Sequence, residues 1–474
     1  MGTRMSKELR GGREVLDLLG VGFGPSNLAL AIAVSEHNSA VPERERLRAR
    51  FLERQECFGW HRGMLIDDAT MQVSFLKDLV TLRNPASDFS FLAYLHEQGR
   101  LVDFVNHKTL FPLRVEFHDY FRWAADRVSH LVSYGTEVTA VHPVVGGGRV
   151  THFEVSTRDG SVYAARNLVV ATGLVPSLPE GMSASERVWH NSDLLHKVDG
   201  VSSASRFVVV GAGQSAAETT AMLHERFAEA EVCAVFSRYG YSPSDDSPFA
   251  NRVFDPAAVD EFHGAPQDVR DRLLAYHANT NYSVVDIELI EDLYRRHYRE
   301  KVIGEQRLRI LNASRVTEVA ETDDGVHVTV ESLTTGRRTV LHADVVVCAT
   351  GYRPGDMTTL LGEAATMLRR DKAGRPLVAR DYRLLTESDA DAAVYVQGGA
   401  TEHSHGITSS LLSNNAVRSR EILDSVLGRT ASTQGGRNGA EIADAYSGGA
   451  EAHPGVGVGV GTGAPGGGGL RHVG

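Results

Sequence analysis

Four apolar runs of strand length punctuate the chain, and two of them lead into helical patterns. VLDLL (15–19) leads through a glycine turn into GVGFGPSNLALAIAV, and FVVVGAGQSAAETTAML, from 207, repeats that order. LVVATG (168–173) and VVVCATGY (345–352) end in the same short word. Because strands that alternate with helices form parallel sheets, the pattern predicts an α/β protein with two Rossmann-like dinucleotide-binding domains.

Two β-rich stretches interrupt this pattern. Residues 136–166 and 315–343 contain strand-like runs broken by GGG, DG and TG, and each predicts a small antiparallel meander. The predicted organisation is a disordered lead (1–14), the first part of one nucleotide domain (15–203), a second nucleotide domain (204–340) with a helical segment at 240–300, the remainder of the first domain (341–430), and a disordered glycine-rich tail (431–474).

Composition narrows the function classes. The chain has 474 residues, 42% hydrophobic and 23% charged, which is typical of an enzyme with a large core. The formal charge of −11 argues against nucleic acid or an anionic membrane surface as a main partner.

The cysteines and the apolar stretches bear on compartment and redox chemistry. Cys57, Cys233 and Cys348 form no CxxC pair, which excludes a dithiol redox centre of that type and a cysteine-based zinc site. Free thiols predict the cytoplasm. The first 14 residues lack the apolar core of a signal peptide, and no run of 18 apolar residues predicts a membrane span.

The first glycine turn is a G-x-G-P-x-N variant of the dinucleotide fingerprint. Gly22 permits the tight turn, Gly24 lets the backbone approach a pyrophosphate, and Pro25 and Asn27 follow at the helix start. Glu53 ends the next predicted strand, where an acid hydrogen-bonds a ribose hydroxyl.

The second turn, with Gly211 and Gly213, is followed by a strand that ends at Arg238 instead of an acid. A guanidinium there suits the 2′-phosphate of NADP, although a solvated loop arginine is the alternative. Two such folds together indicate FAD and NADPH, with hydride passing from nicotinamide to flavin. Because there is no CxxC pair to take electrons from the reduced flavin, the electron acceptor is oxygen or an unusual oxidant.

Several strings are more specific than either glycine motif. They are GVGFGPSNLAL, FGWHRGM, MQVSFLKDLVTLRNP, RVEFHDYFRW, GAGQSAAE, PSDDSPFANRVF, TNYSVVD, CATGYRP and HGITSSLLS. Over about residues 16–427 the chain resembles the flavin-dependent N-hydroxylating monooxygenases, which hydroxylate ornithine or lysine side chains in siderophore pathways. The resemblance implies FAD in the first domain, NADPH in the second, substrate binding by the segment 240–300 and a substrate loop within 341–430.

The resemblance also implies roles for single residues. Lys77 matches a lysine that pairs with the substrate α-carboxylate, and Asn251 matches an asparagine that holds the same end. Asn281 matches an asparagine near the reacting amine, and Ser410 occupies a third substrate-contacting position that Ser409 or Ser413 could also supply. A surface lysine, or asparagines in turns or helix caps, are the structural alternatives.

The cofactor side is implied in the same way. The expected flavin contacts are Trp60, His61, Met71, Gln72 and Arg114, and the expected NADPH contacts are Gln214 and Ser215, with Tyr282 and Ser410 bordering the same cofactor cleft. Of all these residues, Gln72, Arg114 and Asn281 are expected to act in catalysis.

The implied reaction is NADPH- and O₂-dependent N-hydroxylation through a C4a-hydroperoxyflavin, with L-ornithine converted to N5-hydroxyornithine. L-Lysine, a diamine, another amino acid or a sulfur compound remain alternative substrates, and an uncoupled NADPH oxidase or flavin reductase is an alternative activity. Lys77 and Asn251 favour a substrate with a free amino-acid end. The resemblance further implies a homo-oligomer, a tetramer in relatives.

Overall fold

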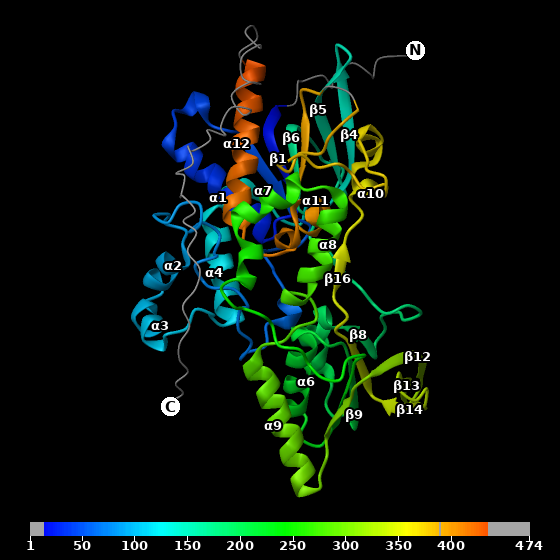
Figure 1. The fold of residues 1–474 in the computed structure, drawn as a ribbon. Coiled ribbons are helices and arrows are strands. Elements are labelled where there is room, and N and C mark those ends of the chain that lie inside the picture. The colour runs from blue at the N-terminus through cyan, green and yellow to red at the C-terminus, as the bar shows by residue number, and fades with distance from the viewer. Residues whose placement is uncertain (1–13, 388–389, 435–474) are drawn as a thin grey trace, which may run out of the picture. The chain divides into compact units, whose positions relative to one another are not determined.

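The computed structural model describes residues 14–387 and 390–434, and a seven-stranded sheet forms its first half (Figure 1). In sheet order the strands are β3 (Val132–Ser133), β2 (Ala49–Leu52), β1 (Val15–Val21), β6 (Val162–Val170), β5 (Arg149–Thr157) and β4 (Val138–Gly146), with β17 (Ala393–Val396) also beside β6. The strands from β3 to β6 run parallel, and β17 is parallel to β6.

Strand β6 changes partner along its length. Its first residues, 162–165, pair antiparallel with β5, and residues 167–170 pair parallel with β17. The meander predicted for 136–166 is therefore present as β4 and β5 with the start of β6, and it extends the parallel sheet.

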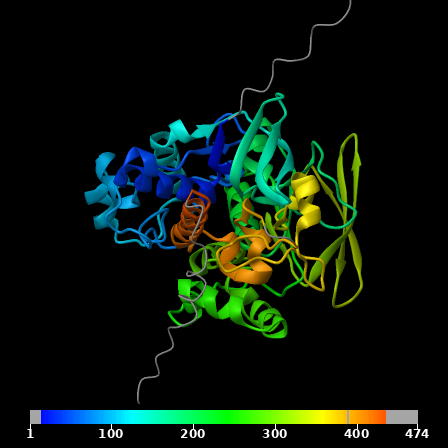
Figure 2. The ribbon, with the colours of Figure 1, turned by 90° about the horizontal axis from the view of Figure 1, so that it is seen from above.

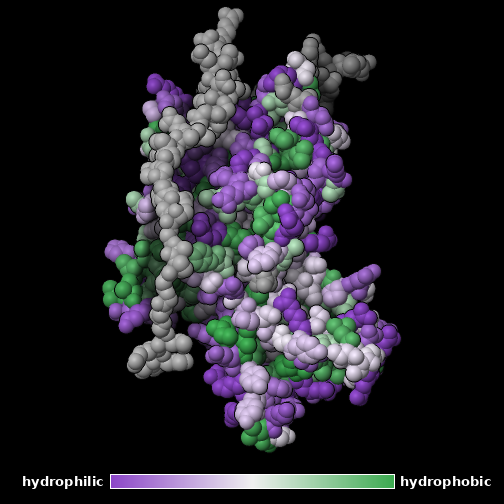
Figure 3. Space-filling view, viewed as in Figure 1, coloured by the Kyte–Doolittle hydropathy of each residue, from purple (hydrophilic) through white to green (hydrophobic). Residues whose placement is uncertain are grey.

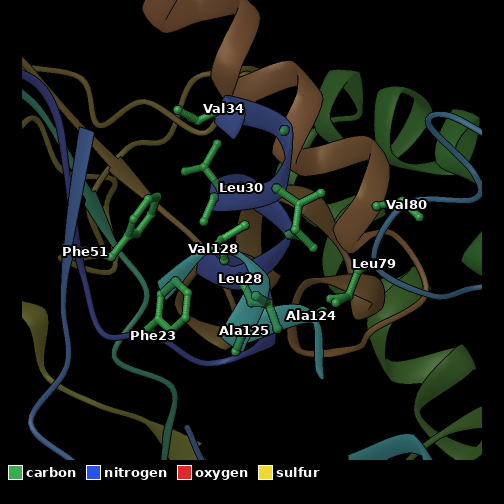
Figure 4. Packing of buried hydrophobic residues seen from close by; sticks show 14 of the residues in the cluster. Phe23, Leu28, Leu30, Val34, Phe51, Leu79, Val80, Ala124, Ala125 and Val128 are labelled. Carbon is green, nitrogen blue, oxygen red and sulfur yellow. The ribbon is translucent and has the colours of Figure 1, made fainter. Parts of the chain in front are cut away.

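Helices cover this sheet and bury its core. Figure 4 shows Leu28 of α1 (Pro25–Ala40) beside Ala124 and Ala125 of α4 (Arg114–Arg127), with Leu30 and Val34 farther along α1 in the same cluster. The aromatic-rich stretch that includes α2 (Phe91–Glu97) and α3 (Leu101–His107) packs here as well, and α12 (Asn415–Gln434) adds Ile422, Leu423 and Val426. Apolar burial of this extent stabilises the first half of the molecule by the hydrophobic effect.

The second half is built on a five-stranded parallel sheet. Its order is β11 (Leu308–Leu311), β10 (Glu231–Val235), β9 (Arg206–Val210), β15 (Val345–Cys348) and β8 (Val188–His190). Helix α6 (Gln214–Arg226) packs against β9 and β10, and α9 (Ile287–Ile303) packs against α6 and β11.

Two smaller sheets and several short helices complete the chain. The meander predicted for 315–343 is present as the antiparallel sheet of β12 (Ser314–Thr322), β13 (Gly325–Ser332) and β14 (Arg338–Ala343). Figures 1 and 2 place it on the side opposite α2 and α3. The remaining elements are the antiparallel pair β7 (Leu174–Pro176) and β16 (Tyr352–Pro354), with α5 (Leu194–Lys197), α7 (Pro256–Gly264), α8 (Gln267–His277), α10 (Met357–Leu361) and α11 (Glu402–His405).

The predicted domain boundaries at 203/204 and 340/341 are wrong. Strand β8 was assigned to the first domain and β15 to its returning part, yet both pair within the second sheet. The pairing partner of a buried parallel strand depends on tertiary contacts that its own residues do not specify. Along the chain, β7 comes directly after β6 of the first large sheet, and β16 comes directly after β15 of the second. The two short strands pair antiparallel with each other.

Two further predictions, the disordered lead and the disordered tail, concern the ends of the chain. Residues 1–13 of the predicted lead and 435–474 of the predicted tail lie outside the described residues. Helix α12 continues to Gln434, so the first four residues predicted as tail are helical. Within the described ranges, no helix combines the length and apolar character that a membrane span requires.

Candidate active site

Two clefts open at the carboxyl ends of the parallel strands, where ligands bind in folds of this type. The first, of about 870 Å³, is lined by residues predicted to contact a cofactor, among them Gly22, Gly24, Pro25, Glu53, Trp60 and His61. The second, of about 750 Å³, is lined by Gly211, Gly213, Gln214, Ser215, Arg238, Asn281 and Tyr282. Both volumes lie within the range of ~300–1,000 Å³ seen for cofactor sites.

The first turn has the geometry that an approaching pyrophosphate needs. Gly22 has φ +84°, and a Cβ there would lie 2.5 Å from the carbonyl oxygen of Ala171. Gly24 faces open space and precedes α1, which begins at Pro25. The helix N-terminus therefore presents free N–H groups and its favourable dipole to the cleft.

The second turn repeats this construction. A Cβ at Gly211 would lie 2.3 Å from the carbonyl oxygen of Ala349. Ala171 and Ala349 begin the two ATG words of the sequence, so each word supplies the carbonyl that packs against a cofactor turn. Each word ends in a glycine with positive φ, Gly173 (77°) and Gly351 (80°), a conformation that favours glycine.

Asn27 holds the first turn from behind and is not among the residues that line the cleft, so its predicted cofactor contact stays a prediction. It is fully buried, and its amide nitrogen donates to the carbonyl oxygen of Gly22 (2.7 Å). Its carbonyl oxygen accepts from Gln397 Nε2 (3.0 Å). An amide at this position bonds both to the turn and to the segment after β17.

Glu53 lies in the wall of the first cleft. Its carboxylate is buried and accepts hydrogen bonds from the backbone N–H groups of Phe23 (2.6 Å) and Gln55 (2.9 Å). These bonds fix the carboxylate between the glycine turn and the end of β2.

Trp60 and His61 form the side of the first cleft. Their rings meet edge to face at 4.8 Å, and His61 has a left-handed backbone with φ 48°. The surrounding protein, aided by the positive charge of Arg114, lowers the pKa of His61 to about 4. The imidazole is therefore neutral at physiological pH and can border an aromatic cofactor without adding charge.

The two clefts meet at the β7–β16 pair. Leu174, Tyr352, Gly399 and Ser410 line both of them, so these four residues define the seam between the clefts. Beside the seam, the Tyr282 hydroxyl donates to the carboxylate of Glu402 (2.6 Å). A group bound at the seam can be reached from both clefts.

A buried ion pair joins the two halves of the molecule close to this seam. Arg114, at the start of α4, makes a bidentate contact with Glu218 of α6, with N···O distances of 2.7 and 2.9 Å. The two side chains are only 12% and 5% exposed. Arg114 also donates to the backbone carbonyl of Met64 (2.9 Å), which follows the Trp60–His61 loop.

Gln72 extends the ion pair into a network. Its amide donates to Asp286 Oδ2 (2.5 Å), and Asp286 precedes α9. Gln214, the first residue of α6, bonds both to Glu218 Oε1 (3.0 Å) and to the backbone N–H of Asp286 (2.8 Å). Gln72 and Arg114 are not among the residues that line the two clefts, and their side chains bond to Asp286 and Glu218 of the other half of the molecule. Their expected roles at the flavin stay predictions.

Met71 precedes Gln72, and its predicted flavin contact stays a prediction. Its side chain is 5% exposed and belongs to the core cluster of α1 and α4. The neighbouring side chain of Gln72 points the opposite way, toward α9. The backbone of Met71 is fixed by its N–H bond to the carbonyl of Pro112 (2.8 Å).

The predicted substrate residues come together around short helices. Lys77 lies with its ammonium nitrogen 5.5 Å from the ring centre of Phe254, in the 3₁₀ helix Ala250–Phe254 that also carries Asn251. This helix packs against the 3₁₀ helix Ile407–Ser410, which ends at the seam residue Ser410. Burial lowers the pKa of Lys77, and the Asp255 carboxylate opposes that change.

Comparison with known proteins decides the family. The family model for L-lysine 6-monooxygenase/L-ornithine 5-monooxygenase matches residues 14–354. An L-ornithine N(5)-monooxygenase of Burkholderia cepacia is 41% identical over 83% of this chain and 90% of its own length. The chain belongs to this family.

Solved structures agree with the assignment. An ornithine N-hydroxylase of Kutzneria sp. 744, described with reduced FAD, NADP⁺ and L-ornithine, is 47% identical, with a TM-score of 0.84 over 88% of this chain and 100% of that one. An L-lysine 6-monooxygenase of Pseudomonas syringae is 31% identical, with a TM-score of 0.77 over 87% and 99%. The predicted family and the α/β fold with two nucleotide domains are confirmed.

Sequence reasoning missed the residues of this monooxygenase that connect its parts. Glu218 stands in the quoted string GAGQSAAE four residues after Gln214, a spacing that places both on one helix face. Asp286 ends TNYSVVD immediately before α9. Tyr352 stands in the quoted string CATGYRP and Glu402 in none, and neither position at the seam is predictable locally, because the seam forms only when segments from both halves meet.

Glu218→Gln is expected to destabilise the protein by about 3–5 kcal/mol, because it leaves the Arg114 guanidinium buried without its counter-charge. Glu225→Gln on the same helix is the matched control. Glu225 is 69% exposed and pairs with Arg296 at 3.3 Å, so it should cost less than about 1 kcal/mol. Urea denaturation followed by circular dichroism measures both variants. Equal losses would contradict a structural role for the buried pair.

Proposed function

We propose that the protein hydroxylates the side-chain nitrogen of L-ornithine to give N5-hydroxyornithine, using NADPH and O₂. The balanced reaction is R–NH₂ + O₂ + NADPH + H⁺ → R–NHOH + NADP⁺ + H₂O. The observation that carries the proposal is the seam, where the two clefts meet at Ser410 and Asn281 lines the second of them. The 3₁₀ helix that ends at Ser410 packs against the helix that carries Asn251 and Phe254, and Lys77 lies on the Phe254 ring. Membership of the family supplies the reaction class.

FAD occupies the first cleft and NADPH the second. Glu53 at the end of β2 favours a ribose with a free 2′-hydroxyl in the first cleft. Arg238 at the end of β10 favours a 2′-phosphate in the second, and its bonds to Ser283 O (2.8 Å) and Ser242 Oγ (3.3 Å) orient the guanidinium. When bound, the flavin supplies the chemistry that passes electrons from NADPH to oxygen.

The amino-acid end of the substrate binds to Lys77 and Asn251. A lysine on a flexible stem beside the Phe254 ring presents a point charge to the α-carboxylate. The Asn251 amide nitrogen bonds to the carbonyl of Asp246 (2.6 Å), which fixes the orientation of the side chain. A substrate held at this end extends its side chain along the Ile407–Ser410 helix toward Ser410.

The reacting amine must be neutral to act as a nucleophile, although an alkylammonium has a pKa of about 10.4 in water. Among the described residues that line the second cleft, Glu402 is the one acid, and its carboxylate already accepts from Tyr282. Burial raises the pKa of Glu402. The amine therefore meets Asn281, a neutral side chain, instead of a free carboxylate, and a weakly solvated site lowers its pKa.

Ornithine is preferred over lysine because the relatives and structures named for ornithine are 41% and 47% identical, against 31% for the lysine enzyme. A difference of one methylene in a pocket changes binding by only about 1–3 kcal/mol. L-Lysine is therefore the second candidate, and a measured ratio of kcat/KM decides between them.

Self-association through α3 is part of the proposal. The helix exposes Val102 (70%) and Val105 (63%), and Figure 3 shows apolar side chains at this edge of the molecule. Clustered exposed apolar residues of this kind are typical of protein interfaces.

The three cysteines support a cytoplasmic location, because Cys57, Cys233 and Cys348 are all free thiols and reducing compartments preserve thiols. A chain found in a secreted fraction would contradict this assignment.

The substrate proposal is tested with L-ornithine, L-lysine, putrescine and cadaverine, by measuring hydroxylamine formed per NADPH consumed. L-Ornithine is expected to give the highest kcat/KM and close to one hydroxylamine per NADPH. Peroxide alone with all four amines would contradict the proposed activity.

Lys77→Ala is expected to raise the KM for L-ornithine about tenfold or more, since a hydrogen bond to a charged group contributes about 1.5–3 kcal/mol. Flavin reduction by NADPH should not change. Putrescine, which lacks the carboxylate, provides the internal control, and Lys301→Ala on exposed α9 is the matched variant. An equal KM increase for putrescine would remove Lys77 from the carboxylate site.

Arg238→Ala is expected to raise the KM for NADPH about tenfold or more, because it removes hydrogen bonds to the charged 2′-phosphate. The KM for NADH, which lacks this phosphate, should stay nearly unchanged. Steady-state oxidation of each dinucleotide measures both values. An equal increase in KM for NADPH and for NADH would place Arg238 away from the 2′-phosphate.

The double variant Val102→Glu with Val105→Glu is expected to lower the molar mass measured by light scattering, because charges at the core of an interface oppose burial. Val145→Glu on β4, where the side chain is 64% exposed, is the control. An unchanged mass in the α3 variant would contradict the proposed interface.

A further inference from the structure

The outer face of the β12–β14 sheet carries a cluster of metal-ligand side chains far from the seam. His327 on β13 and His342 on β14 are direct cross-strand partners, and Asp324 lies in the turn before β13. Within the residues that the structure describes, these three side chains form the one group whose ligand atoms all lie within 4.8 Å of one another. None of the three belongs to the residues that line the two clefts.

The strand alternation explains why both histidines face solvent. Val326 and Val328 on β13 and Leu341 on β14 point inward and pack on the second large sheet. Successive residues of a strand point to opposite faces. His327 and His342 therefore stand on the outer face, where their rings are 5.2 Å apart between centres.

Asp324 is oriented toward the histidines. Its Oδ1 accepts a hydrogen bond from the Thr322 hydroxyl (2.6 Å), which fixes the carboxylate plane. Its Oδ2 lies 3.5 Å from His342 Nε2.

We propose that Asp324, His327 and His342 bind one divalent transition-metal ion of the zinc class. Zn²⁺ takes imidazole nitrogen and carboxylate oxygen at about 2.0–2.2 Å, and water completes a four-coordinate shell. The imidazoles exclude Ca²⁺ and Mg²⁺ as preferred ions, because those cations select oxygen ligands. The exposed side chains close around an ion by rotamer changes, while the paired strands keep their backbones fixed.

The bound ion joins β13 to β14 and to the turn after β12. This sheet packs on the second large sheet through Val326, Val328 and Leu341. Ser314 and Arg315, at the start of β12, line the second cleft. Zinc binding therefore stabilises the second domain beside its nucleotide site, without entering the reaction.

Isothermal titration of the full-length flavin-loaded protein with ZnCl₂ tests the site. The unmodified chain is expected to bind one equivalent with micromolar affinity that His327→Ala and His342→Ala each weaken by at least about tenfold, since even outer-shell partners of a metal contribute about 10–100-fold. His130→Ala, at an exposed histidine in the 3₁₀ helix Ser129–Leu131, is the matched control. The number of zinc ions bound per chain distinguishes this site from zinc bound elsewhere on the protein.

Replacing Zn²⁺ by Co²⁺ gives a second readout, because ligand-field absorption reports nitrogen coordination directly. The unmodified chain and the His130→Ala variant should show it, and both site variants should lose it. Zinc binding that is unchanged in His327→Ala and His342→Ala, or weakened equally in His130→Ala, would overturn the proposal.

Discussion

The bidentate contact between Arg114 and Glu218 is the interaction on which the relation of the two nucleotide folds depends. It is buried, it joins α4 of the first half to α6 of the second, and Arg114 also bonds to the backbone that follows the Trp60–His61 loop. Gln214 connects the same carboxylate to the N-terminus of α6, which lines the second cleft. The Arg114–Glu218 pair therefore holds both the wall of the first cleft and the N-terminal end of α6 at the second cleft.

The glycine turns depend on a second constraint, the close approach of two backbones. At Gly22 and Gly211 the space for a Cβ is already taken by carbonyl oxygens of the ATG words. Asn27 fixes the first of these turns through its buried amide. The chain therefore positions each pyrophosphate with backbone and leaves polar side chains to choose between cofactors, as Glu53 and Arg238 do in our proposal.

The fold class, both glycine turns and both meanders were predictable because each depends on local patterns such as strand, turn and helix periodicity. The domain boundaries were not, because β8 and β15 find their partners only in the assembled sheet. Resemblance located the segments around Gln72 and Arg114, but it could not predict that their side chains bond to Asp286 and Glu218. The seam was unpredictable from any one segment, since Leu174, Tyr352 and Ser410 come from three separate ones.

The central claim is that a flavin and a nicotinamide reach the seam from opposite clefts and meet a substrate held by Lys77. A crystal structure with FAD, NADP⁺ and L-ornithine tests this most directly. We expect the isoalloxazine ring in the first cleft and the nicotinamide in the second, both at Leu174, Tyr352, Gly399 and Ser410, with the ornithine carboxylate on Lys77. Exchanged cofactors, or an ornithine carboxylate bound away from Lys77, would contradict it.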